Sequence, residues 1–212
     1  MTQPGAEAQL FVPDSYVAAN PGMIVRDHPF AVLVTANAGG IHATSTPIYF
    51  EEDWDETRLI GHIARRNAQA ATLEEGASAL AVFSGPHAYI SSRWYQDLPQ
   101  VPTWDYVAAH ARGWIEPLDE EDAALAVLRR IIAIEEAGAA EPWTLEAAPP
   151  GRIAMLLPKI RAFRVHVATL EGVTKLNQGH PPSDRARIVD ALSGRGESSE
   201  DAIARLIAAL PA

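Results

Sequence analysis

The 212-residue sequence contains no cysteine. This absence excludes disulfide bonds, thiolate-bound zinc, iron–sulfur clusters and a thiol nucleophile. A chain of this length buries roughly 70% of its unfolded surface on folding, so it needs no such cross-link. We therefore predict one domain with an ordinary hydrophobic core and no metal site.

Long apolar runs are also missing. No segment approaches the roughly 20 apolar residues of a membrane-spanning helix. The opening residues, MTQPGAEAQL, lack the basic-then-apolar pattern of a signal peptide. These two observations predict a soluble cytoplasmic protein that does not contact a membrane.

Positive charge is scarce. Lysine and arginine total 17 against 27 aspartates and glutamates, which gives a formal net charge of -10, and no basic run exceeds two arginines. Affinity for nucleic acid depends mainly on neutralising phosphates, so this balance argues against direct DNA binding. No pair of predicted helices has clear helix-turn-helix spacing either. Only a basic face formed locally, for example in a dimer, would escape this argument.

Several catalytic fingerprints are absent. The sequence has no G-x-S-x-G, no G-x-G-x-x-G, no Walker A motif and no H-E-x-x-H. None of the seven histidines has the i, i+4 spacing of a helical metal pair. His87 and His110 lie in or beside an aromatic segment and are candidates for an acid–base or haem-ligand role. The catalytic residues, if the protein is an enzyme, stay unassigned.

Short β-rich segments dominate from Phe30 onward. The turn residues Asn37 to Gly40 predict a hairpin between the first two strands, and the Gly85-Pro86 pair predicts a break between the fourth and fifth. Strands of this length and spacing favour a closed or partly closed barrel. The six predicted strands are residues 30–36, 41–50, 57–63, 77–85, 88–95 and 104–115.

Helical patterns follow the predicted barrel. Asp119 is a candidate N-cap for a helix at about 120–137 that ends at Gly138, with an apolar stripe of Leu125, Leu128 and Ile132. Two shorter helices are predicted at 183–192, ended by Gly194, and at 199–210. The predicted class is α+β, mainly β with helices. Residues 1–194 would form the barrel domain, and 195–212 a C-terminal helical extension of it.

A candidate phosphate site lies in the segment from Gly61 to Gly76. A strand ends near Ile63, Arg65 and Arg66 follow, and Asn67 can cap a short helix up to Gly76. A helix N-terminus and guanidinium groups both bind phosphate oxygens. The alternative is that both arginines are solvated loop charges, which is what most surface charges are.

The second candidate region is the stretch from Gly85 to Tyr106. It contains five amphipathic aromatic side chains with serine and threonine between them, an arrangement that suits a flat ligand as well as a core or a dimer interface. Composition does not decide between these. The aromatic residues are Tyr89, Trp94, Tyr95, Trp104 and Tyr106.

Taken in order, five segments resemble the successive signatures of the PaiB family. They are AVLVTANAGGIHATSTPIYF, LIGHIARRNAQ, FSGPHAYISSRWY, VPTWDYVAAHARG and LEGVTKLNQG. PaiB proteins are split-barrel proteins related in fold to pyridoxamine-phosphate oxidase and described as FMN-binding negative transcriptional regulators. The resemblance runs from about Phe11 to Leu192.

The resemblance implies a six-stranded split barrel that forms a homodimer with FMN in a groove between the subunits. The FMN phosphate is expected near His62, Arg65, Arg66, Asn67 and Gln69. The ribityl chain and one edge of the flavin ring are expected near Thr44, Ser45, Thr46 and Pro47. The opposite wall would comprise Tyr89, Ser91, Trp94 and Tyr95, with Thr103 and Trp104 near the ring.

This chain departs from the family pattern at several positions. Ala68 and Ala70 stand where members often have proline and tryptophan, and Asp105 replaces an asparagine. The tail signature K-L-S-Q-N reads Lys-Leu-Asn-Gln-Gly here, which puts Asn177 and Gly179 at its variant positions. These departures predict weakened FMN affinity.

Four functions follow from these observations. The first is a flavin-linked transcriptional regulator or redox protein without its own helix-turn-helix. The second is an FMN-dependent oxidoreductase, in which the flavin would supply the chemistry. The others are a haem-binding split barrel and a dimerisation barrel without a ligand.

Overall fold

The computed structural model describes residues 10–96 and 99–211. These residues form two compact units. Unit 1 contains residues 28–83 and 110–170, and unit 2 contains residues 10–27, 84–109 and 171–211.

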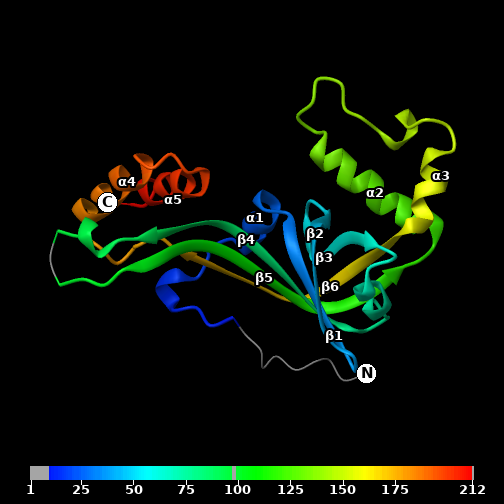
Figure 1. The fold of residues 1–212 in the computed structure, drawn as a ribbon, viewed down its shortest axis with the longest axis horizontal. Helices are drawn as coiled ribbons and strands as arrows, with labels where there is room; N and C mark the ends of the chain where they lie inside the picture. The colour runs from blue at the N-terminus through cyan, green and yellow to red at the C-terminus, as the bar shows by residue number, and fades with distance from the viewer. Residues whose placement is uncertain (1–9, 97–98, 212) are drawn as a thin grey trace. The chain divides into compact units, whose positions relative to one another are not determined.

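The described residues contain six strands in the order β1-β2-β3-β6-β5-β4, which closes a barrel. Neighbouring strands whose register is defined run antiparallel. The predicted six-stranded α+β barrel is therefore confirmed. The strands are β1 (Phe30–Asn37), β2 (Gly40–Glu52), β3 (Asp55–Ala64), β4 (Ser78–Ile90), β5 (Thr103–Leu118) and β6 (Ile160–Lys175) (Figure 1).

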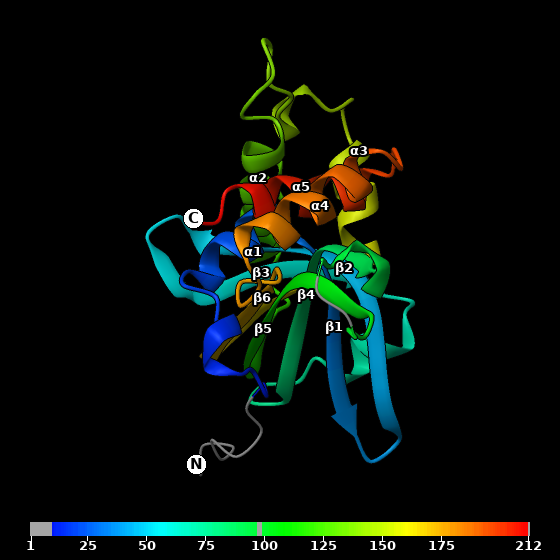
Figure 2. The ribbon, with the colours of Figure 1, turned by 90° about the vertical axis from the view of Figure 1, so that its left-hand side faces the viewer.

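The β1–β2 hairpin forms as its turn residues predict. Asn37 pairs with Gly40 across a two-residue turn, and the Asn37 side chain accepts a hydrogen bond from the Gly39 N–H at 2.8 Å. Gly40 has φ +121°, a conformation that side chains with a Cβ rarely adopt. Figure 2 shows this hairpin in blue.

Two strand predictions were wrong. β4 runs without a break through Gly85 and Pro86 to Ile90, because a proline lacks only its N–H and still fits extended backbone. Residues beyond Ile90 are not a strand, and Ser92–Trp94 form the 3-10 helix η3. The strand that completes the count of six is β6, which the sequence reasoning missed because arginines and a histidine interrupt its apolar pattern.

The helices in the described residues are mostly short. Near the C-terminus, the predicted end of α4 at Gly194 is confirmed. None of the helices is long and apolar enough to span a bilayer. They are α1 (Pro21–Asp27), α2 (Glu121–Glu135), α3 (Arg152–Leu156), α4 (Pro182–Ser193) and α5 (Ser198–Ala208), with 3-10 turns η1 (Asp14–Tyr16), η2 (Ala68–Thr72), η3, η4 (Leu145–Ala147) and η5 (Leu157–Lys159).

Helix α2 differs in detail from its prediction. Its N-cap is Glu120, without a side-chain cap, because the Asp119 carboxylate instead accepts two hydrogen bonds from Arg161. The helix ends at Glu135 and is capped by Glu136, two residues before Gly138. Its buried face is also rotated by about one residue. Ala124 and Val127 are buried, whereas the predicted stripe of Leu125, Leu128 and Ile132 is only half-buried.

Unit 1 has a packed interior and a helix-covered patch. Leu33, Ile48 and Phe163 are fully buried. Outside the barrel wall, α2 packs on a small cluster of Ile60, Leu118, Ala124, Val127 and Ala162. The Tyr49 hydroxyl donates to Glu135 at 2.7 Å, which fixes the last turn of α2 to β2.

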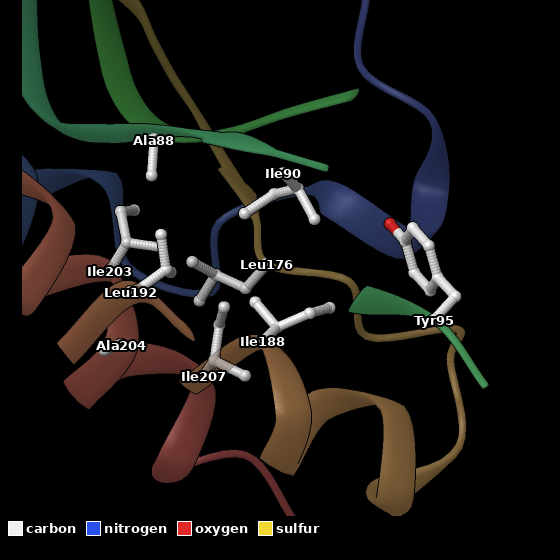
Figure 3. Close-up of a cluster of buried hydrophobic side chains, with 9 residues drawn as sticks. All are labelled: Ala88, Ile90, Tyr95, Leu176, Ile188, Leu192, Ile203, Ala204 and Ile207. Carbon is white, nitrogen blue, oxygen red and sulfur yellow. The ribbon is translucent and has the colours of Figure 1, made fainter. Parts of the chain in front are cut away.

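Unit 2 has its own apolar cluster. Helices α4 and α5 lie side by side (Figures 1 and 2), joined by residues 194–197. Figure 3 shows their side chains gathered against the end of β4. The cluster consists of Ala88, Ile90, Tyr95, Leu176, Ile188, Leu192, Ile203, Ala204 and Ile207.

Candidate functional site

A basic depression lies where β3 ends in unit 1. Ala64 pairs with Ile160 at the start of β6, so Lys159 is brought next to Arg65, and the Arg65 N–H donates to the Lys159 carbonyl at 2.8 Å. The depression is lined by Ala64, Arg65, Arg66, Pro158 and Lys159, and all three cationic side chains are exposed. We call these three cations the basic corner.

The three cations of the basic corner differ in their partners. The Arg65 guanidinium donates to the Ile160 carbonyl at 3.1 Å and lies 3.6 Å from the Asp119 carboxylate. Within the described residues, Arg66 and Lys159 have no ion-pair partner. These two charges are therefore available to an anion.

The segment after the basic corner is confirmed in part. Asn67 caps it as predicted, because its Oδ1 accepts from the Gln69 N–H at 3.0 Å. The element is the short 3-10 helix η2, however, not a helix reaching Glu75. Its Gln69 and Ala70 N–H groups are already bound by Asn67. The cations, not a helix dipole, are therefore what this corner offers to a phosphate.

Predicted residues on β2 contact predicted residues on β3 and just after it, in two pairs. The Asn67 side chain donates to the Thr44 hydroxyl at 2.8 Å, and the Thr46 hydroxyl donates to the His62 carbonyl at 2.6 Å. Ser45 is exposed between the two threonines. Nine residues are predicted to lie near the phosphate and the ribityl chain. These two hydrogen bonds join four of them, Ser45 is exposed beside them, and Pro47 is half-buried.

Gln69 and His62 are held in the protein rather than exposed. Gln69 is 1% exposed, and its Nε2 donates to the Leu33 carbonyl and the Thr35 hydroxyl, both at 3.0 Å. It therefore ties η2 to β1. Burial lowers the pKa of His62, and its Nδ1 has no hydrogen-bond partner among the described residues. The imidazole is neutral near pH 7 and lies on β3, three residues before Arg65.

Unit 2 carries an exposed aromatic face. Strand alternation turns His87 and Tyr89 of β4 and Trp104 and Tyr106 of β5 outward, and these four residues define the aromatic face. Trp104 is 54% exposed. Its ring lies 5.9 Å from that of Tyr89, edge to face, and 6.1 Å from that of His87. These separations are those of aromatic rings that pack on one another, and the exposed Trp104 side chain is a part of the face that a ligand can reach.

The other predicted aromatic residues point elsewhere. Because the strand stops at Ile90, Ser91 turns inward and caps η3, and its hydroxyl accepts from the Arg93 N–H. Tyr95 is 3% exposed in the apolar cluster of unit 2, and Trp94 packs against the same cluster. Of the predicted wall, Tyr89 and Trp104 share one face, and Ser91, Trp94 and Tyr95 do not lie on it.

A polar network lies behind the aromatic face. The Lys175 ammonium donates to the Trp104 carbonyl at 2.7 Å and to the Thr103 hydroxyl. Asp105 is fully buried, and its Oδ2 accepts from the Asn177 amide. Burial raises the pKa of Asp105 to about 6, against a smaller lowering by Asn177 and Lys175. Burial and nearby carboxylates raise the pKa of Tyr95 to about 12.

Sequence reasoning missed Lys159 as a site residue and did not foresee the Asp105–Asn177 contact. A correct prediction of β6 would have found Lys159, because antiparallel pairing with β3 places the residue before β6 next to Arg65. Asp105 and Asn177 were recognised only as two separate departures from the family pattern. No local signal pairs residues 72 positions apart.

The predicted residues divide between the units. The phosphate and ribityl set lies in unit 1, together with His110. The aromatic set, together with His87, lies in unit 2.

The Trp114 and His166 rings of unit 1 stack with their centroids 5.4 Å apart. His166 Nε2 lies 2.6 Å from Glu116, which also pairs with Arg164, so this histidine belongs to a structural polar network.

The six-stranded closed barrel defines a split-barrel protein. Residues 10–169 match the family model described as "Putative FMN-binding domain", and the chain belongs to this family. It is 28% identical over 201 residues to "Protease synthase and sporulation protein PAI 2" of Bacillus subtilis, covering 93% of this chain and 96% of that protein.

Two solved structures show the same fold. The flavocytochrome Anf3 from Azotobacter vinelandii matches with a TM-score of 0.57 at 14% identity, covering 80% of this chain and 73% of that one. The FAD and haem binding protein from Mycobacterium smegmatis matches with a TM-score of 0.54 at 15% identity, covering 73% and 69%. At these identities the likeness establishes the split-barrel architecture.

Proposed function

We propose that the protein binds FMN, with the phosphate held by the basic corner. The observation that carries this proposal is a pair of exposed cations, Arg66 and Lys159, that lie beside Arg65 and have no ion-pair partner among the described residues. A phosphate monoester carries two negative charges near neutral pH, and charge-assisted hydrogen bonds from guanidinium and ammonium groups are the strong ones. Family membership is the second support.

The chain's own residues would bind and orient the flavin. Thr44 and Asn67 form a preset polar pair beside the basic corner, and exposed Ser45 adds a hydroxyl. Trp104, whose side chain is 54% exposed, is the residue of the aromatic face that the family resemblance places near the isoalloxazine. Bound FMN supplies one- or two-electron transfer, whereas the protein supplies orientation and electrostatics.

We further propose that the protein is a homodimer with the flavin groove between subunits, and that it acts as a flavin-linked regulator in the cytoplasm. The relationship to PAI 2, whose name refers to protease synthesis and sporulation, supports a regulatory role. The proposal includes no direct DNA contact. The N-cap and first turn of α5 carry Glu197 and Asp201, whose negative charges would disfavour contact with DNA phosphates.

The test is an FMN titration of the apo protein, followed by flavin fluorescence. The double variants Arg65→Ala/Arg66→Ala and Arg66→Ala/Lys159→Ala should each weaken binding at least tenfold, which corresponds to about 1.4 kcal/mol. Arg129→Ala/Arg152→Ala removes two exposed arginines elsewhere in unit 1 and is the charge-matched control. Equal affinities in all three variants would contradict the phosphate assignment.

Two further measurements address the assembly and the role. Analytical ultracentrifugation at micromolar concentration should give a dimer, and a monomer would refute the shared groove. A gel-shift titration at low salt with the protein's own upstream DNA should show no complex at micromolar protein. A salt-sensitive shift would instead establish direct DNA binding. A haem titration monitored at the Soret band serves as the alternative if FMN does not bind.

A further inference from the structure

Asp105 is an acidic residue buried in the strand that presents the aromatic face. It lies on β5 between Trp104 and Tyr106, whose side chains point outward, so alternation turns its carboxyl inward. Its exposed fraction is 0%. A buried carboxyl is costly unless its oxygens are hydrogen-bonded, which makes its partners informative.

Asn177 connects Asp105 to Tyr95. The Asn177 Nδ2 donates to Asp105 Oδ2, and its Oδ1 accepts from the Tyr95 hydroxyl at 2.8 Å. Both ends of one amide are thus used inside unit 2. Asn177 itself has φ +58°, a left-handed conformation that is uncommon for residues with a side chain. The two hydrogen bonds offset the cost of that conformation.

Within the part of the chain that the structure describes, Asp105 has too few hydrogen bonds and no ion pair to offset the cost of burying a charged carboxylate. Its Oδ1 has no hydrogen-bond partner among the described residues. Lys175 is the cation near it, but the Lys175 ammonium is already bound to Thr103 and the Trp104 carbonyl. Tyr95 is neutral near pH 7.

Other titratable groups surround the chain of hydrogen bonds. The His180 ring lies 4.6 Å from that of Tyr95, and His180 Nδ1 lies 3.9 Å from Asp184. Asp184 on α4 accepts from the Gln96 N–H at 2.7 Å. The Lys175 ammonium nitrogen lies 5.9 Å from the centre of the Tyr16 ring, which belongs to η1. None of these groups makes a hydrogen bond to Asp105.

We propose that Asp105 is a positioning residue for the aromatic face, and that its uncharged carboxyl, held through Asn177 to Tyr95, keeps Trp104 and residues 176–180 in place. When Asp105 loses its proton, a charge is buried with hydrogen bonds from Asn177 alone, and the start of β5 and residues 176–180 loosen. The part of this proposal that concerns the flavin rests on the proposed function, because the family resemblance places the flavin ring near Trp104.

The raised pKa of Asp105 decides how the stability of the protein changes with pH. Because burial raises the pKa of Asp105 to about 6, the native state holds this proton more tightly than the unfolded chain does. Stability from this group is complete below the unfolded pKa and falls as pH rises through about 6. Wild-type apo protein should therefore be less heat-stable at pH 7.5 than at pH 5, by about 3–5 °C in Tm relative to Asp105→Asn.

The experiment uses apo protein, so it does not depend on FMN. Tm is measured from pH 5 to 7.5 for wild type, Asp105→Asn and the control Asp190→Asn, which removes an exposed carboxylate of α4. The fluorescence difference between wild type and Trp104→Phe is recorded over the same range. All of these proteins also carry His87→Gln, which removes a second titratable ring 6.1 Å from that of Trp104. We expect the difference signal to titrate near pH 6 in the wild-type and Asp190→Asn backgrounds, and to stay flat in the Asp105→Asn background.

If Asp105→Asn does not fold, a carboxyl-¹³C NMR titration of the wild-type protein measures the pKa of Asp105 directly. One aspartate should titrate near pH 6, and Asn177→Ala should move that midpoint upward, because the amide hydrogen bond favours the ionised form. Parallel pH curves for wild type and Asp105→Asn, or no aspartate midpoint above about pH 5, would overturn the proposal. A Tm effect without any Trp104 signal would reduce Asp105 to a structural residue and likewise overturn it.

Discussion

The Asn67 side chain joins two segments that lie 23 residues apart in the sequence. Its Nδ2 donates to the Thr44 hydroxyl at 2.8 Å, while its Oδ1 accepts from the Gln69 N–H at 3.0 Å. One side chain thus caps η2 and fixes it to β2. These hydrogen bonds also restrict the backbone of Arg65 and Arg66 in the basic corner, because the two arginines directly precede Asn67.

Asn67→Ala should destabilise unit 1 by about 1–2 kcal/mol, since it removes a cap and a second hydrogen bond. Urea unfolding measures this. Asn67→Asp is the matched control, because its carboxylate still caps η2 but cannot donate to Thr44. It should therefore recover part of the loss. If Asn67→Ala unfolds at the wild-type urea concentration, the side chain does not hold this corner.

Gly113→Ala should be among the most damaging single substitutions in unit 1. A Cβ at this position would lie 1.8 Å from the His166 carbonyl oxygen, so β5 and β6 would have to separate. We expect a loss of about 3 kcal/mol or more, or failure to fold. Gly138→Ala is the control, because nothing lies within 4 Å of its added methyl group. Similar Tm values for the two variants would contradict this packing.

Ile188→Ala should destabilise unit 2 by about 2–5 kcal/mol, because the side chain is fully buried in the cluster between β4, α4 and α5 (Figure 3). Leu206→Ala on α5 is the matched control. Leu206 is 37% exposed, so its truncation should cost much less. The comparison is made by thermal unfolding at one pH. A larger loss for Leu206→Ala would show that α5 packs through its other face.

Asp119 should contribute stability that is lost in acid. Hydrogen bonds from Arg161, together with the charges of Arg161 and Arg65, lower the pKa of Asp119. Its contribution is therefore present above the unfolded pKa and disappears as pH falls through the lower folded pKa. Because Asp119 is 46% exposed, we expect Asp119→Asn to cost only about 0.5–1 kcal/mol at pH 7.

The comparison for Asp119→Asn is urea unfolding at pH 7 and at pH 2.5. The difference from wild type should shrink toward zero at the lower pH. A difference that is constant with pH would mean that the substitution acts through packing and not through the ion pairs. Glu146→Gln, which removes an exposed carboxylate paired with Arg129, provides the comparison for a surface pair.

Local features of the sequence were sufficient to predict the barrel class and its first strands. The Asn37–Gly40 turn, the β-rich runs on either side, the Asn67 cap and the end of α4 at Gly194 all depend on residues close in sequence. Such short-range signals report backbone conformation directly. The family resemblance followed from the same ordered segments.

The tertiary structure decided which of these residues meet. Lys159 joins Arg65 only because β6 pairs with β3. Asp105 meets Asn177 only because β6 lies beside β5 in the barrel, which brings the residues after β6 to the start of β5. Asp119 illustrates the same limit, since its local role as a cap was overridden by two hydrogen bonds from Arg161. Strand pairing and burial decide which side chains far apart in sequence meet. Local sequence signals therefore determined the barrel class and most of its elements, whereas the packed fold determined β6 and the contacts between elements.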